Sequence, residues 1–164
     1  KRVLPMGAPT SPALSNIVML KFDNIVADKV KEGGWSYTRY ADDITLSRQT
    51  DYGAIQHIIR KVYGLITSFG FIPNFKKTKI LYKSNCQRVT GIVVNEEPHI
   101  QRKKERIFRA RLHNVYCAVI KDGEDPKLYE DEIKYICGYY AFMVSVNDVY
   151  RKRYGKKIEA IRRR

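Results

Sequence analysis

Apolar residues recur at roughly helical spacing between Ser11 and about Lys31, which predicts the first helix of the chain. Ser11 suits the N-cap and Pro12 the first helical position, while Gly33 and Gly34 end the pattern. The apolar positions that predict this helix are Leu14, Ile17, Val18, Leu20, Ile25 and Val26. This spacing is typical of a capped helix in a protein core.

Strand-forming residues come next and are followed by a second helical pattern. Two short runs of such residues flank Ala41-Asp42-Asp43 and predict a β-hairpin that turns at these three residues. The runs contain Trp35, Tyr37, Tyr40, Ile44 and Leu46. From Tyr52 to about Phe69 a clear apolar face predicts a helix packed under a sheet, with Asp51 or a neighbour as its cap and Gly70 as its stop.

The middle of the chain predicts more strands. Ile80–Tyr82 is expected to form a short strand after a lysine-rich loop. Residues 88–100 alternate as a hairpin with its turn at Asn95–Pro98.

From Gln101 onward the pattern becomes helical and basic. The first helix there has an apolar side made of Ile107, Leu112, Val115, Tyr116 and Val119. A turn at Asp122–Pro126 separates it from a helix over about 127–144, and a last helix starts at Asn147-Asp148. The order of elements predicts an α+β protein in which an antiparallel sheet with packed helices precedes a helical bundle.

Composition and charge favour a polyanionic partner. The chain has 164 residues, 44% of them hydrophobic, a net charge of +14, and 12 tyrosines among its lysines and arginines. Cations neutralise phosphates and aromatic rings stack on bases, so nucleic acid is a better match than a membrane surface. The chain has no apolar run long enough to span a membrane, no secretory signal and no CxxC spacing, which favours a cytoplasmic protein with reduced thiols.

Two adjacent acids, Asp42 and Asp43, lie at the predicted hairpin turn. Their mutual repulsion would be relieved by a divalent cation, and a pair of hard oxygen ligands suits Mg²⁺. An exposed polar turn is the alternative interpretation, because Asp is common in turns. The dipeptide by itself does not decide between them.

Four segments, in this order, resemble motifs of reverse transcriptases, and the last of them resembles a signature of the retron-type branch. They are Leu4–Pro12, Tyr40–Asp43, Gly70–Phe71 with Asn74 and Lys77-Thr78, and Val89–Gly91. The resemblance covers essentially the whole chain, which corresponds to the second half of a complete enzyme. It implies part of a polymerase palm at residues 1–87, a primer-grip hairpin at 88–100 and a helical thumb at 101–164.

The resemblance also implies an activity. The complete enzyme would be an RNA-directed DNA polymerase that uses two Mg²⁺ ions to copy a structured non-coding RNA into single-stranded DNA, in a retron anti-phage defence system. Its implied partners are the RNA template, the RNA–DNA duplex, dNTPs, the N-terminal fingers and palm half, and an effector protein.

The site residues follow from the same resemblance. Asp42 and Asp43 are the implied catalytic and metal-binding pair. The nucleotide- and template-binding residues are Leu4, Pro5, Met6, Gly7 and Lys77. The primer- and RNA-binding residues are Tyr40, Ala41, Val89, Thr90, Gly91, Arg102, Lys103, Lys104, Arg106, Arg109 and Arg111. Asp23 and Asp28 are interpreted as structural or solvated.

Two features keep alternatives open. Met6 stands where the family usually carries Gln, so either nucleotide selection is altered or the site is partly degenerate. The family also uses a third carboxylate from an upstream motif, so this chain alone is expected to bind nucleic acid without polymerising. The alternatives are a non-catalytic RNA-binding scaffold and a group II intron, diversity-generating or CRISPR-linked reverse transcriptase.

Overall fold

The computed structural model describes residue 5 and residues 7–49 and 55–164. The chain forms two compact units, Lys1–Lys79 and Ile80–Arg164. Each unit has its own hydrophobic core. The two units are therefore described separately.

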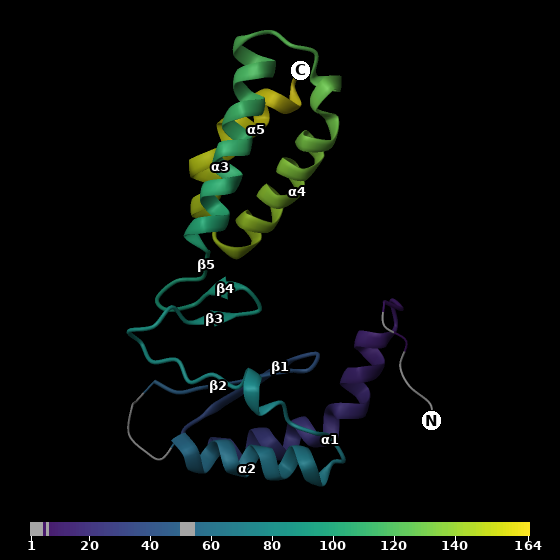
Figure 1. Ribbon diagram of the computed structural model, residues 1–164, viewed down its shortest axis with the longest axis vertical. Helices are drawn as coiled ribbons and strands as arrows, with labels where there is room; N and C mark the ends of the chain where they lie inside the picture. Colours follow the sequence, from purple (N-terminus) through teal and green to yellow (C-terminus); the bar gives the residue numbers. More distant parts are fainter. Residues whose placement is uncertain (1–4, 6, 50–54) are drawn as a thin grey trace. The chain divides into compact units, whose positions relative to one another are not determined.

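The first unit packs two helices and a β-hairpin around one small core (Figure 1). Its elements are α1 (Ser11–Lys31), β1 (Ser36–Tyr40), β2 (Asp43–Ser47), α2 (Ile55–Ser68) and a 3₁₀ turn, η1 (Phe75–Lys77). Both helices place apolar side chains against one face of the hairpin. The buried members are Phe22, Val26, Val30, Ile58 and Val62, with Trp35, Tyr37, Ile44 and Leu46 of the hairpin packed against them.

Helix α1 differs from the sequence expectation at its N-terminal half. The N-cap position is Thr10, so Ser11 is already helical, and its Oγ donates a hydrogen bond to the carbonyl oxygen of Pro5 at 2.8 Å. The fully buried residues of α1 begin at Phe22, and in the N-terminal half Met19 is partly buried against the core. Leu14, Ile17, Val18 and Leu20 are 44–69% exposed.

The second unit begins with a small antiparallel sheet in the order β3-β4-β5. Its strands are β3 (Arg88–Val89), β4 (Ile92–Val93) and β5 (His99–Ile100). The expected turn at Asn95–Pro98 connects β4 to β5, and a further tight turn at Thr90-Gly91 connects β3 to β4. The strand expected at Ile80–Tyr82 is absent from the described structure, since this segment pairs with no described strand.

Three helices complete the second unit (Figure 1). Helix α3 (Arg102–Tyr116) continues into a π-helical turn, η2 (Cys117–Lys121). After the 3₁₀ turn η3 (Pro126–Tyr129) come α4 (Glu130–Val146) and α5 (Val149–Arg162). The expectation of three helices in this part of the chain is confirmed.

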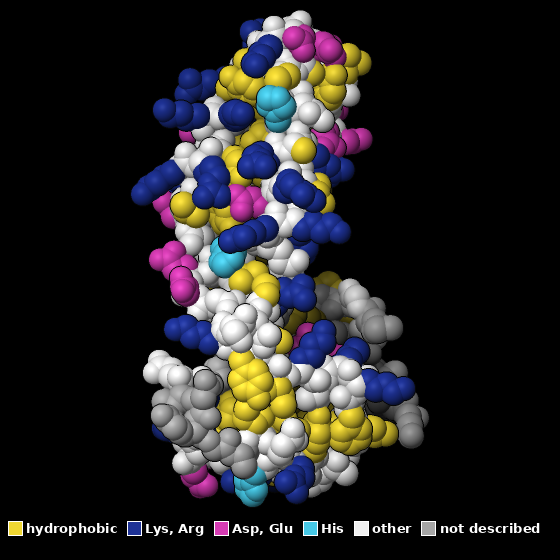
Figure 2. Space-filling view, turned by 60° about the vertical axis from the view of Figure 1, so that its left-hand side comes forward, with side chains coloured by type: hydrophobic (Ala, Val, Ile, Leu, Met, Phe, Trp, Pro, Cys, Tyr) yellow, Lys and Arg dark blue, Asp and Glu magenta, His cyan; other side chains and the backbone are white. Residues whose placement is uncertain are grey.

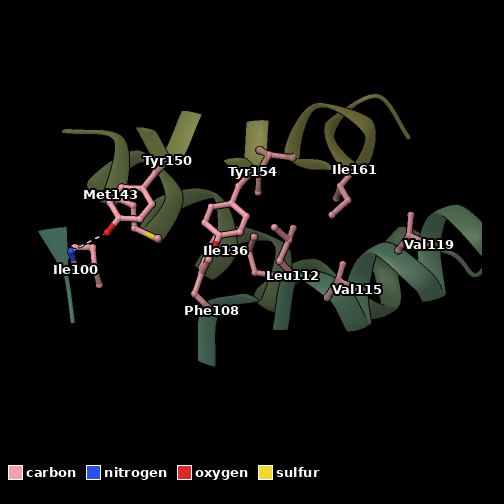
Figure 3. Close-up of a cluster of buried hydrophobic side chains, with 11 residues drawn as sticks. Ile100, Phe108, Leu112, Val115, Val119, Ile136, Met143, Tyr150, Tyr154 and Ile161 are labelled. Atoms are coloured by element: carbon pink, nitrogen blue, oxygen red, sulfur yellow. Dashed lines mark hydrogen bonds between the residues drawn. The ribbon is translucent and has the colours of Figure 1, made fainter. Parts of the chain in front are cut away.

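The core of the second unit lies between α3, α4 and α5 (Figure 3). Its buried side chains are Ile100, Phe108, Leu112, Val115, Val119, Ile136, Met143, Tyr150, Tyr154, Ile158 and Ile161. The Tyr150 hydroxyl accepts a hydrogen bond from the backbone N–H of Ile100 at 2.9 Å. The sheet is thereby joined to the bundle through a buried polar contact.

Across the described ranges, no helix has the length and apolar content needed to cross a membrane.

Candidate functional site

The carboxylate pair lies at the tip of the first unit's hairpin. Strands β1 and β2 pair in a register that sets Tyr40 opposite Asp43, so Ala41 and Asp42 alone form the turn and Asp43 is the first residue of β2. Ala41 has a φ of +52°, a conformation that non-glycine residues rarely adopt. Tyr40, Asp42 and Asp43 are exposed. The local fold thus presents both carboxylates to solvent.

Neither carboxylate is neutralised by a described cation. None of the ion pairs among the described residues includes Asp42 or Asp43. The nearest arginine in the sequence, Arg39, points its guanidinium to Asp23 of α1 instead. Two adjacent acids that no described cation neutralises are suited to bind a metal ion from solution.

Arg39 is the centre of a dense polar cluster beside the turn. Its Nε and Nη2 atoms donate to the two carboxylate oxygens of Asp23 at 2.8 and 2.7 Å. Its Nη1 donates to the carbonyl oxygen of Ala41 at 2.8 Å, and Nη2 also contacts Asn16 Oδ1 at 3.2 Å. The hydroxyl of Tyr37 donates to Asp23 Oδ1 at 2.6 Å. The Arg39 side chain is only 4% exposed.

The cluster shifts the acidity of its members. Hydrogen bonding from Arg39 holds the pKa of Asp23 below its usual value. Burial, reinforced by the hydrogen bond to Asp23, raises the pKa of Tyr37 well above its usual value. Asp23 is therefore an ionised structural carboxylate, as the sequence suggested, but its bond to Arg39 spans sixteen residues and had no local sequence signal.

The two carboxylates at the hairpin tip fit a Mg²⁺ ion whose remaining ligands come from a substrate and water. Within the part of the chain that the structure describes, no group of three or more His, Cys, Asp or Glu side chains could hold a metal ion. Mg²⁺ in phosphate chemistry commonly takes one or two protein carboxylates, and substrate phosphates and waters complete its shell. Asp42 and Asp43 provide these two carboxylates.

The described candidate nucleotide-binding residues, Pro5, Gly7 and Lys77, lie at exposed positions of the first unit. Gly7 has a φ of +88°, and a Cβ placed on it would meet no described atom within 4 Å, so a ligand could approach the backbone there. Leu4 and Met6 lie outside the described residues. Lys77 is exposed at the end of η1, next to Thr78, whose Oγ1 accepts a hydrogen bond from the Tyr63 hydroxyl at 2.5 Å.

Val89–Gly91 forms the tight turn of the small sheet. Thr90 and Gly91 have φ values of +48° and +87°, the positive pair that a type I′ turn requires. A β-branched residue is an outlier in this region, which marks Thr90 as strained. Gln101 Nε2 donates to the carbonyl oxygen of Gly91 at 3.3 Å. Thr90 is exposed, and its backbone is held in an uncommon conformation.

The helices of the second unit carry most of its candidate nucleic-acid contacts. Figure 2 shows many Lys and Arg side chains on the visible face of these helices. The predicted residues on α3 are all exposed, and those outside every ion pair between described residues are Arg102, Lys103, Lys104, Arg106 and Arg109. Arg111 is already engaged, because its Nε bonds Glu132 at 3.1 Å and its guanidinium lies 4.3 Å from the ring centroid of Tyr135.

A second basic helix was not among the predicted site residues. Helix α5 adds the exposed side chains of Arg151, Lys152, Lys156 and Lys157. The clustering of these residues in seven positions was visible in the sequence.

Comparison with known proteins identifies relatives over most of the chain. Residues 1–135 match the family model described as reverse transcriptase (RNA-dependent DNA polymerase). The Retron Ec86 reverse transcriptase of Escherichia coli is 32% identical over 157 residues, which cover 93% of this chain and 45% of that protein. The Retron Ec83 reverse transcriptase of Escherichia coli is 34% identical over 158 residues, covering 94% and 48%.

A bacterium of another genus provides a further relative. The Retron Mx65 reverse transcriptase of Myxococcus xanthus is 39% identical over 112 residues, which cover 68% of this chain and 26% of that protein. The chain spans less than half the length of these curated relatives.

Proposed function

Because the chain belongs to the reverse transcriptase family, we propose that it provides the catalytic carboxylate pair and the duplex-binding helices of a retron reverse transcriptase. The first unit would be part of the palm, residues 88–100 the primer grip and the helical bundle the thumb. The intact enzyme would copy a structured RNA into single-stranded DNA. The relatives that match along most of the chain are retron enzymes, which supports this branch of the family.

The observation that carries the proposal is the state of the hairpin tip. Asp42 and Asp43 are adjacent, exposed and outside every ion pair between described residues, while the neighbouring Arg39 is bound to Asp23. A protein without a use for the pair would gain by replacing one acid, since adjacent like charges repel. The pair is therefore suited to bind Mg²⁺.

The chemistry of the site follows from charge and position. Bound Mg²⁺ would neutralise the triphosphate and lower the pKa of the primer 3′-hydroxyl. Asp42 would be the more direct ligand, with Asp43 beside it. Ala41 keeps the turn small, so a primer end can approach the carboxylates, and exposed Tyr40 offers a ring for stacking. Phosphoryl transfer depends mainly on such positioning and charge stabilisation.

The basic helices would hold the duplex. Exposed Lys and Arg side chains on α3 bind backbone phosphates without regard to sequence, and release of counterions supplies the affinity. Lys77 would add positive charge near the triphosphate. The Val89–Gly91 turn would contact primer or cognate RNA.

We further propose that polymerisation needs protein outside this chain. A third carboxylate and the fingers would come from the rest of the enzyme, so the chain by itself would bind nucleic acid without extending it. A role in anti-phage defence, with an effector protein, follows from the retron assignment and is part of the same proposal.

Substitution of the carboxylates in the full-length protein tests the proposal. Asp42→Asn and Asp43→Asn are expected to abolish Mg²⁺-dependent primer extension on an RNA template while leaving duplex binding intact. Asp28→Asn, an exposed acid of α1, is the control and should extend like the wild type. A wild-type protein that binds RNA but incorporates no nucleotide at any Mg²⁺ concentration would favour the scaffold instead.

A further inference from the structure

One polar cluster connects the carboxylate-bearing hairpin to the long helix beneath it. Arg39 of β1 donates from both ends of its guanidinium, to the carboxylate of Asp23 on α1 and to the carbonyl oxygen of Ala41 in the turn. Tyr37, two residues earlier on the same strand, donates to Asp23 as well. The turn and the helix are thus bridged by a single nearly buried side chain.

Building on the proposed function, we propose that Asp23, Arg39 and Tyr37 are positioning residues for nucleotidyl transfer. Together they fix the turn in the conformation that presents Asp42 and Asp43, and Asp23 keeps Arg39 from pairing with these carboxylates. None of the three would touch substrate or metal.

The bond to Ala41 acts directly on the peptide that leads to Asp42. The carbonyl oxygen of Ala41 belongs to the peptide group between Ala41 and Asp42, so the Arg39 contact fixes the plane of that group. Ala41 is in the positive-φ region, which costs an alanine free energy and persists only where neighbouring contacts hold it. Arg39 provides such a contact.

Only a planar, forked cation can make all of these contacts. The guanidinium binds both carboxylate oxygens of Asp23 side by side and still has a third nitrogen for Ala41. A lysine side chain keeps the positive charge, but its ammonium group cannot donate two parallel hydrogen bonds to the carboxylate as the planar guanidinium does. Arg39→Lys therefore separates the geometric role of the residue from its charge.

Asp23 has a second, electrostatic role. Its carboxylate accepts three hydrogen bonds from Arg39 and Tyr37, and the Arg39 cation balances its charge, which makes it a weaker candidate for a metal ligand than Asp42 or Asp43. At the same time it neutralises the arginine that lies two residues before the turn. Without this partner, the Arg39 cation could pair with Asp42 or Asp43 and compete with Mg²⁺.

The test uses three substitutions in the full-length protein, with Glu32→Gln as a matched control. Glu32 is the C-cap of α1 and pairs with Lys61 at 3.7 Å; it precedes β1, which begins at the open end of the hairpin, opposite to the tip that carries Asp42. Each variant is measured by primer-extension turnover, by the Mg²⁺ concentration giving half-maximal rate, and by thermal unfolding. Binding of Mn²⁺ without substrate, followed by electron paramagnetic resonance, provides a readout that is independent of activity.

Substitutions at the two charged positions are expected to impair primer extension in different ways. Arg39→Lys should lower turnover by about tenfold or more, since small misplacements of catalytic groups have large effects, and extra Mg²⁺ should not restore it. Asp23→Asn should raise the half-maximal Mg²⁺ concentration several-fold and weaken Mn²⁺ binding, with partial rescue at high Mg²⁺. Tyr37→Phe should give a smaller loss, and Glu32→Gln none.

Three outcomes would overturn the inference. A folded Arg39→Lys protein with wild-type turnover would show that the guanidinium contacts of Arg39 do not position the turn. An Asp23→Asn protein with unchanged Mn²⁺ binding would reject the electrostatic role. Unfolding of all three variants, including the mild Tyr37→Phe, would make the cluster merely structural. An inactive wild type would instead reject the proposed function itself.

Discussion

At the residue scale, backbone strain coincides with the motifs proposed to be functional. Among the described residues, Ala41 and Thr90 are the two non-glycine positions with positive φ. One precedes the carboxylate at Asp42 and the other lies in the Val89–Gly91 turn. Strained residues gather at sites where the surrounding structure must hold a specific geometry, so the coincidence supports the choice of both turns.

The ionised state of Asp23 predicts a pH dependence of stability. Its pKa is lowered in the folded protein, chiefly by the hydrogen bond from Arg39. The contribution of Asp23 to stability is therefore fully present above its unfolded pKa of about 3.9 and is lost as the pH falls through the lower folded value. Asp23→Asn should be less stable than wild type in urea unfolding at pH 7, and the difference should shrink below about pH 4. A difference that stays constant with pH would contradict this.

At the element scale, periodicity predicted the helices better than their buried faces. The α3 pattern correctly placed Leu112, Val115 and Val119 in the core, but Ile107 is 47% exposed and Phe108 is buried instead. Phe108 is four residues before Leu112, so it completes the same helical face. Leu14, Ile17, Val18 and Leu20 in the first half of α1 are exposed, because burial depends on neighbouring elements and not on the pattern of one helix.

The site was predictable only in part, for a related reason. The hairpin and its two acids follow from strand-forming residues around a short polar turn, which is local information. The partnership of Arg39 with Asp23 depends on how β1 packs on α1, and no spacing within either element indicates it. The prediction of a strand at Ile80–Tyr82 was wrong, because a strand needs a neighbouring strand to pair with as well as strand-forming residues.

The contact between β5 and α5 predicts a measurable loss of stability. Tyr150→Phe keeps the buried ring but removes the acceptor of the Ile100 N–H. An unpaired buried N–H group costs about 1–3 kcal/mol, so the free energy of unfolding should fall by that amount in a urea titration. Tyr135→Phe is the control, since this ring is 43% exposed, and it should change the value by no more than about 0.5 kcal/mol. Equal effects of the two substitutions would contradict the role of the bond.

At the scale of the whole molecule, the net charge of +14 is the most general property that the account must explain. Residues 99–164 contain 17 Lys and Arg against 9 Asp and Glu, or +8. This excess is presented largely by α3, by α5 and by the arginines at residues 162–164. A surface of this kind fits a duplex bound through its phosphates.

Salt dependence tests whether α3 binds the phosphates of the duplex. Replacing Arg102, Lys103 and Lys104 by Gln in the full-length protein should reduce the slope of log affinity against log salt by about 0.9 for each phosphate that the variant no longer neutralises. The control replaces Lys121, Lys127 and Lys134, which removes the same charge from exposed positions away from the start of α3. Fluorescence anisotropy with an RNA–DNA duplex measures both. Equal slopes for the two triple variants would mean that net charge, and not α3, determines binding.

The most direct test of the central claim is single-turnover incorporation of one nucleotide by the full-length protein bound to a primed RNA template at saturating Mg²⁺. Asp42→Asn is expected to lower this rate by at least about 10³-fold while the affinity for the primed template stays unchanged. A rate within about tenfold of the wild type would contradict the account, because the carboxylates at the hairpin tip would then not be the groups that hold the catalytic metal.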